Sequence, residues 1–240
     1  MLMKEFDLLI EDLGACDLCT KLKNKNFADC SLVNFYSDKN ICKKIPSMWT
    51  DWSRRLDADI MIIGQDWGPF SEMKRLHEKY LENETAETWE ELIETEKSLT
   101  KRNLEKFLKQ SALSNGLKLE KDFMKKIYIT NAIMCARKGN NYRGDNINIL
   151  ASTMNCTKYL KRQIDIVKPK VIMTLGYYPL LALSKIYDFS IAKNLSSVMN
   201  ETKSIVKDDF ILIPLYHPAA QVASEKQLEQ YNLIWQFLKK

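Results

Sequence analysis

The stretch MIIGQDWGPF (residues 61–70) starts as an apolar run and ends in a turn. An apolar run that stops at a glycine is typical of a strand buried on both faces that leaves its sheet at that point. Gln65 and Asp66 therefore follow directly after a predicted strand. A stiff strand of this kind can deliver the Asp66 carboxylate to one edge of a sheet.

Three other runs along the chain share this nearly continuous apolar character. The four predicted strands are DIMIIG (59–64), KIYITN (126–131), KVIMTLG (170–176) and FILIPLY (210–216). Segments with helical periodicity separate them, such as LASTMNCTKYLKRQIDIV (150–167). Strands alternating with helices indicate parallel βαβ units. The sequence predicts an α/β fold, a three-layer α/β/α sandwich with a central four-stranded parallel sheet.

The 240 residues are enough for one domain with a substantial core. We expect a single domain over residues 1–240. Residues 1–50 hold four cysteines and no clear strand, so we expect a Cys-rich segment that docks on the domain through a metal site. Residues 71–122 are long for one crossover and are expected to form a helical insertion.

Composition and charge limit the partners and the cellular location that we expect for the protein. The net charge of +5 permits a polyanionic partner without demanding one. No apolar run approaches the roughly 20 residues that span a bilayer, and acids interrupt the apolar positions of the N-terminal MLMKEFDLLIEDL, unlike a signal peptide. We therefore expect a cytoplasmic monomer with no membrane partner.

Polar side chains follow three of the predicted strands. They are Asp66, Asn131 and His217. Ligands of open parallel sheets bind beyond the carboxyl ends of the strands, so these three should converge. A carboxylate can stabilise a cationic transition state, an amide can read a nucleobase edge, and an imidazole donor can stabilise charge on a leaving group.

The cysteines indicate a metal site. A chain without an export signal is not expected to use its six cysteines in disulfides. Cys16 and Cys19 have the CxxC spacing of metal ligands, but two ligands are too few. The residues alone leave open which of the others complete the site: Cys30, Cys42, Cys135 or Cys156.

At these residues the sequence resembles the uracil-DNA glycosylase superfamily, and is most similar to its iron–sulfur, family 4-like branch. The motifs are IIGQDWGPF, YITNAIMC and LYHPAA, in the family's order over residues 60–219. One departure is Trp67 and Gly68, which follow Asp66 where iron–sulfur members typically have a proline. The GQD opening is instead similar to the classical branch without iron.

The resemblance implies a cofactor. It implies a [4Fe–4S] cluster held by Cys16, Cys19, Cys135 and Cys156, a set of four thiolates that suits such a cluster. The competing interpretation is zinc, bound locally by Cys16, Cys19, Cys30 and Cys42. The cluster would be structural and would fasten the N-terminal segment to the sheet.

The resemblance also implies an activity. It implies hydrolysis of the N-glycosidic bond of a pyrimidine, uracil first, in a flipped or single-stranded nucleotide of DNA, which leaves an abasic site. Asp66 would position water and stabilise the sugar cation, and His217 would steady the departing base. Base-binding residues would be Gln65, Gly68, Phe70 and Asn131.

The loop ARKGNNYRG (136–144) combines cations with an aromatic residue. Such a loop can contact phosphates and stack on a base. The predicted DNA-binding residues are Arg137, Lys138, Tyr142 and Arg143.

Two alternative functions remain. The resemblance to the classical branch implies that Gly68 stands where a tyrosine would exclude a substituent at the pyrimidine 5-position, which suits a glycosylase that excises a bulky 5-modified pyrimidine from phage DNA in antiviral defence. The other alternative is a non-catalytic nucleic-acid-binding protein on the same scaffold.

Overall fold

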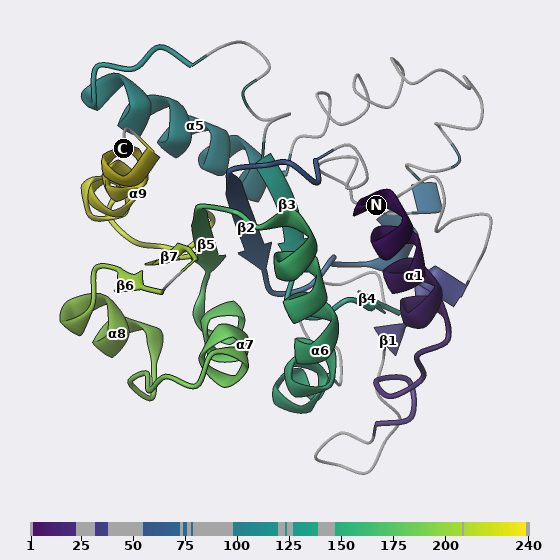
Figure 1. Ribbon diagram of the computed structural model, residues 1–240. Helices are drawn as coiled ribbons and strands as arrows, with labels where there is room; N and C mark the ends of the chain where they lie inside the picture. The colour runs from purple at the N-terminus through teal and green to yellow at the C-terminus, as the bar shows by residue number, and fades with distance from the viewer. Residues whose placement is uncertain are drawn as a thin grey trace.

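The computed structural model describes residues 2–22, 32–37, 55–72, 74–75, 78, 98–119, 123, 127–138, 147–207 and 209–238. A five-stranded sheet of order β3-β2-β5-β7-β6 lies at its centre (Figure 1). The four parallel strands are the predicted ones: β2 (Ile60–Gly64), β3 (Ile127–Asn131), β5 (Val171–Leu175) and β7 (Ile211–Leu215).

The sequence predicted a sheet of four strands, and the structure corrects this number to five. Strand β6 (Ile205–Val206) pairs antiparallel with β7 at the edge of the sheet. It has two residues, and Val206 is 72% exposed. An edge strand this short and this exposed has no continuous apolar run, so the pattern that identifies the central strands does not apply to it.

Helices cover both faces of the sheet, which gives the predicted three layers (Figure 1). Alternate residues of β2 point to opposite faces, as strand geometry requires. Ile60 and Ile62 pack with α5 (Leu99–Ser114) and α9 (Ser224–Leu238) in one core cluster. Met61 and Ile63 belong to the other cluster, with residues of α6 (Ile149–Val167), α7 (Tyr177–Ile186) and α8 (Leu195–Glu201).

Helix α5 lies in the segment that the sequence assigns to an insertion. Its apolar face, with Leu104, Phe107 and Leu108, is buried against the sheet and α9. The indole nitrogen of Trp235 in α9 donates a hydrogen bond to Ser111 Oγ at 2.8 Å. This part of residues 71–122 is therefore one of the layers of the sandwich.

The described part of the N-terminal segment docks on α6. Helix α1 (Leu2–Gly14) buries Phe6, Leu9 and Leu13. After it, β1 (Leu32–Val33) pairs antiparallel with β4 (Ala136–Arg137), and η1 (Phe35–Ser37) follows. Asn34 joins the two pieces, because its side-chain amide donates to the backbone oxygens of Leu13 at 2.7 Å and Cys16 at 2.6 Å.

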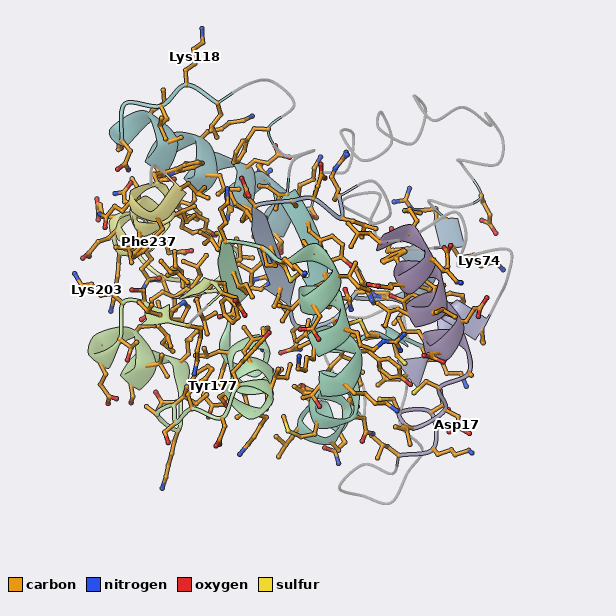
Figure 2. All side chains as sticks on the ribbon, in the orientation of Figure 1. Asp17, Lys74, Lys118, Tyr177, Lys203 and Phe237 are labelled. Atoms are coloured by element: carbon orange, nitrogen blue, oxygen red, sulfur yellow. The ribbon has the colours of Figure 1, made fainter. Side chains whose placement is uncertain are left out.

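The charged side chains of Asp17, Lys118 and Lys203 lie on the outside of the molecule (Figure 2). None of the described helices combines the length and the apolar character that crossing a bilayer requires.

Candidate active site and cysteine cluster

The carboxyl ends of the four parallel strands meet at one edge of the sheet. Gly64 at the end of β2 lies opposite Asn131 at the end of β3, and the backbone N–H of Ala132 donates to Gly64 O at 2.8 Å. Asp66 and His217 each stand two residues beyond the end of a strand, β2 and β7. The negative charge of Asp66 acts on His217 and raises its pKa, although burial outweighs it. The structure thus brings the three predicted residues to the same edge.

The Asp66 carboxylate is surrounded by hydrogen-bond donors. Oδ1 accepts from the backbone N–H of Gly68 at 2.9 Å and from Arg137 Nε at 3.0 Å. Oδ2 accepts from Gln65 Nε2 at 2.9 Å and from Arg137 Nη2 at 2.7 Å. An ionised carboxylate accepts at about four positions, so these four donors use its capacity.

Electrostatics at Asp66 favour the ionised form. Its side chain is only 7% exposed, and this burial by itself raises the pKa. The hydrogen bonds and the charge of Arg137, with the donors on Gln65 and Gly68, outweigh burial and bring the pKa of Asp66 below its usual range. Asp66 therefore carries a negative charge at neutral pH.

Arg137 lies in the site and not on an open loop. Its side chain is 13% exposed and its guanidinium faces Asp66. Its backbone N–H donates to Gly68 O at 2.8 Å, and it forms an isolated parallel bridge with Pro69. Lys138, the next residue, is exposed. The other two residues predicted to bind DNA, Tyr142 and Arg143, are outside the described residues.

Sequence reasoning did not connect Arg137 with Asp66. The two are 71 residues apart, and no local spacing rule relates them. The one available signal is that both follow a predicted strand whose carboxyl end lies at the same edge of the sheet.

Asn131 and Gly64 fit closely together. The Asn131 side chain is buried, and a Cβ atom on Gly64 would lie 2.3 Å from Asn131 Oδ1. That distance is far below a normal van der Waals contact, so any side chain at position 64 would displace the amide. The glycine that ends β2 therefore leaves room for the Asn131 side chain.

His217 presents one ring nitrogen to the protein and stands at the exposed rim of the site. Its Nδ1 accepts a hydrogen bond from the backbone N–H of Ala219 at 3.2 Å. The neutral ring therefore carries its proton on Nε2. Burial of the ring by neighbouring protein atoms lowers the pKa of His217, with Asp66 opposing this. His217 is thus a neutral donor at neutral pH.

The loop after β2 is anchored by Trp67. The Trp67 side chain is 2% exposed and meets Phe35 of η1 edge to face, with ring centroids 6.4 Å apart. Phe70 is half-buried against the same core cluster. Gly68 has a φ of 76°, in the left-handed region that favours glycine. The backbone conformation of this turn is therefore one reason for a glycine at position 68.

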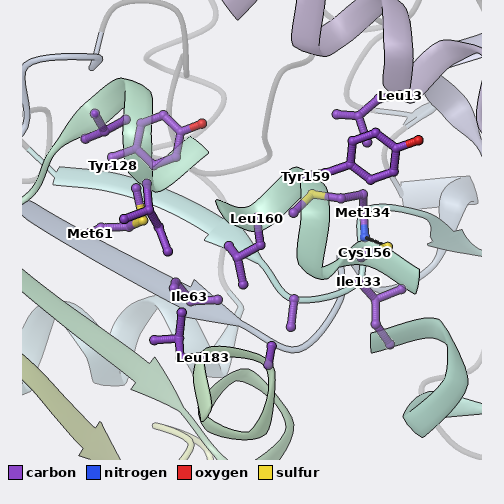
Figure 3. Packing of buried hydrophobic residues seen from close by; sticks show 14 of the residues in the cluster. Leu13, Met61, Ile63, Tyr128, Ile133, Met134, Cys156, Tyr159, Leu160 and Leu183 are labelled. Atoms are coloured by element: carbon purple, nitrogen blue, oxygen red, sulfur yellow. Dashed lines mark hydrogen bonds between the residues drawn. The ribbon is translucent and has the colours of Figure 1, made fainter. Parts of the chain in front are cut away.

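Four cysteines from three separate segments gather beside this site. Cys19, Cys135 and Cys156 are buried and Cys16 is half-buried. The Cys19 sulfur is hydrogen-bonded to the thiols of Cys135 and Cys156, which lowers its pKa to about 3 while the pKa values of the other two rise. Figure 3 shows Cys156 next to Met134, whose backbone N–H donates to the sulfur at 3.5 Å.

The donor set of these cysteines fits a metal cofactor, because thiolates are the ligands of iron–sulfur clusters and of structural zinc. The Cys19 sulfur is hydrogen-bonded to those of Cys135 and Cys156. The described residues contain no group of three or more His, Cys, Asp or Glu arranged to hold a metal ion. Cys30 and Cys42, which belong to the zinc alternative, are outside the described residues.

Comparisons with known proteins agree with this geometry. A type-4 uracil-DNA glycosylase of Sulfurisphaera tokodaii is 40% identical over 110 residues, which are 43% of this chain and 44% of the relative. One of Saccharolobus solfataricus is 33% identical over 96 residues, 39% of this chain and 42% of the relative. The chain thus matches less than half the length of these relatives. The family described as the uracil DNA glycosylase superfamily matches residues 52–239, which include all four parallel strands. The chain therefore belongs to the uracil DNA glycosylase superfamily.

Proposed function

We propose that the protein is a DNA glycosylase that hydrolyses the N-glycosidic bond of a flipped or single-stranded pyrimidine nucleotide, uracil, and leaves an abasic site. One observation carries the proposal: an ionised Asp66, a buried Asn131 amide and a neutral His217 stand at the same edge of the sheet in a chain of this superfamily. The type-4 uracil-DNA glycosylases among its relatives support uracil as the base.

The proposed reaction breaks the bond between C1′ of the sugar and N1 of the base, and the electron pair leaves with the base. His217 Nε2–H donates a hydrogen bond to a carbonyl oxygen of the departing base, where negative charge develops. Asp66 stabilises the positive sugar. Water then adds to C1′ and releases a proton to solvent, while the base takes up a proton.

Two roles are predicted for Asp66, positioning water and stabilising the sugar cation, and the geometry favours the second. All of its acceptor positions face protein donors, so orienting a water molecule would require one donor to leave. Acting as a fixed negative charge requires no such change. We therefore assign Asp66 the electrostatic role.

Recognition of the base falls to Asn131, which offers both a donor and an acceptor to the pairing edge of a pyrimidine. Gln65, Gly68 and Phe70 are proposed to border the base. Lys138, Tyr142 and Arg143 are proposed to contact the DNA backbone, in keeping with the net positive charge.

We further propose that Cys16, Cys19, Cys135 and Cys156 hold a [4Fe–4S] cluster. The gathering of Cys135 and Cys156 around Cys19 supports this set over the local zinc set, which uses neither of them. The cluster would supply a structural cross-link between the segment after α1, the loop after β3, and α6.

The function is tested by an abasic-site assay on purified protein. Substrates are DNA with uracil opposite guanine, uracil opposite adenine and single-stranded uracil, with thymine and bulky 5-modified pyrimidines beside them. Excision of uracil supports the proposal. Excision of modified bases alone, or DNA binding without any abasic site, would replace it with one of the two alternative functions.

Replacing Gly64 with Ala is expected to slow uracil excision by roughly 5–150-fold, which corresponds to the about 1–3 kcal/mol of one base-reading contact. The new Cβ displaces the Asn131 amide from its place beside Gly64. Single-turnover rates measure the effect. Gly116→Ala is the control for a glycine replacement away from the site: its Cβ meets no atom within 4 Å, its φ of 71° strains the alanine backbone, and its excision rate should stay that of the wild type. A Gly64→Ala variant with the wild-type rate would exclude this arrangement of Asn131.

The pH dependence of excision is expected to follow His217. The pKa of His217 lies below the ordinary value of 6.5, so the ring is neutral at pH 6.5 and above, and excision should fall as the pH drops through this lowered pKa. Protonated Nδ1 would point its proton at the Ala219 N–H and break their hydrogen bond. Single-turnover rates between pH 4.5 and 9 test this, with ¹⁵N NMR of the ring as an independent titration. A rate that rises on acidification contradicts it.

A further inference from the structure

We propose that Arg137 is a positioning residue, whose guanidinium keeps the Asp66 carboxylate ionised and in one orientation at the strand-end site. This inference rests on the proposed function for its catalytic meaning. Its physical content, the effect of Arg137 on Asp66, can be measured without any reaction.

The contact has the geometry of a strong, specific pair. Arg137 Nε and Nη2 each donate to a different oxygen of Asp66, at 3.0 and 2.7 Å. Two parallel bonds of this kind fix the plane of a carboxylate as well as its charge. A lysine ammonium is a compact point charge and can supply the charge without fixing the plane to the same extent.

The surroundings explain why a cation is needed. Both side chains are largely removed from water, and a carboxylate in such a place takes up a proton unless a partner compensates. Among the residues that the structure describes, the charged or titratable groups found to act on Asp66 and its neighbour His217 are Arg137 and these two residues themselves. The remaining donors, Gln65 and Gly68, are neutral.

The backbone holds Arg137 in place from two sides. Arg137 N–H donates to Gly68 O in the loop that carries Asp66. In the antiparallel pair of β1 and β4, Arg137 lies opposite Leu32. The guanidinium is therefore supplied by a short strand that is fixed to the Asp66 loop on one side and to the N-terminal segment on the other.

The first arm measures the ionisation of Asp66 directly, in protein without DNA. The side-chain carboxyl carbon is followed by ¹³C NMR against pH and assigned with Asp66→Asn. We expect a wild-type midpoint below the ordinary aspartate value. Removal of a nearby opposite charge in Arg137→Gln should raise it by about 1–3 pH units, and Arg137→Lys should raise it less.

Arg162→Gln is the matched control. It also removes a guanidinium from an arginine–aspartate pair, formed with Asp12 at 2.6 Å, but this pair is exposed and joins α6 to α1. The Asp66 midpoint should not move in this variant.

The second arm measures single-turnover excision against pH. The wild-type acid limb follows His217; in Arg137→Gln the raised Asp66 midpoint should add a second protonation and make the fall on acidification steeper, and Arg137→Lys should restore part of the wild-type profile. An equal loss of rate at every pH, with no rescue by lysine, would show a merely structural role and overturn the proposal.

The two arms separate the inference from the proposed function. If the wild type excises no base, the function fails while the NMR arm still decides the role of Arg137. An Asp66 midpoint at or above the ordinary aspartate value in the wild type overturns the inference, even if the Arg137 variants do not fold. An unchanged midpoint in a folded Arg137→Gln variant overturns it as well.

Discussion

An Asp66→Asn variant is expected to excise uracil roughly 10²–10³-fold more slowly than the wild type, the loss that follows removal of one electrostatic group aimed at a transition state. Asparagine has nearly the shape of aspartate but no charge for the sugar cation. Its amide nitrogen would also face the donors that now surround the carboxylate. Single-turnover formation of abasic sites measures the effect.

Asp165→Asn serves as the control for this variant. Asp165 pairs with Lys161 on the exposed side of α6, so its loss should leave the rate unchanged. Binding of uracil-containing DNA, measured by fluorescence anisotropy, should persist in Asp66→Asn. Equal excision rates for Asp66→Asn and the wild type would remove the foundation of the proposed mechanism.

Replacing Cys156 with Ala is expected to abolish bound iron and sulfide and to cause the largest loss of stability among these variants. The free energy of binding a structural metal is free energy of folding, of order 10 kcal/mol for zinc in small domains, whereas truncating a core side chain costs about 2–5 kcal/mol. Iron and sulfide analysis of the isolated protein and urea-induced unfolding provide the measurements.

The control distinguishes the two proposed ligand sets. Cys30→Ala should retain iron and sulfide if the cluster uses Cys135 and Cys156. If Cys30→Ala loses a zinc ion and Cys156→Ala keeps it, the local zinc site is correct and the cluster proposal is wrong.

The parts of the fold that could be predicted are those whose sequence signal is local. Strands β2, β3, β5 and β7 are buried on both faces, so each has a continuous apolar run. Because the four strands are parallel, the positions of Asp66, Asn131 and His217 at one edge followed from the strand ends alone.

The features that could not be predicted depend on contacts between distant segments. Strand β6 has two residues at a solvent-exposed edge. Arg137 is placed beside Asp66 by pairing of β4 with the distant strand β1 and by a backbone hydrogen bond to Gly68.

In the loop after β2, the consecutive side chains of Asp66 and Trp67 contact two different elements. Asp66 is bound by Arg137 of β4, and Trp67 rests on Phe35 of η1. Both neighbours depend on residues 32–37, which precede the region matched by the superfamily, residues 52–239. A truncation that removes residues 32–37 would delete no group proposed to touch DNA, yet it would remove the partner strand of β4 and the ring that Trp67 packs against. We therefore expect a fragment of residues 52–240 to hold the Asp66 loop less firmly than the full chain does.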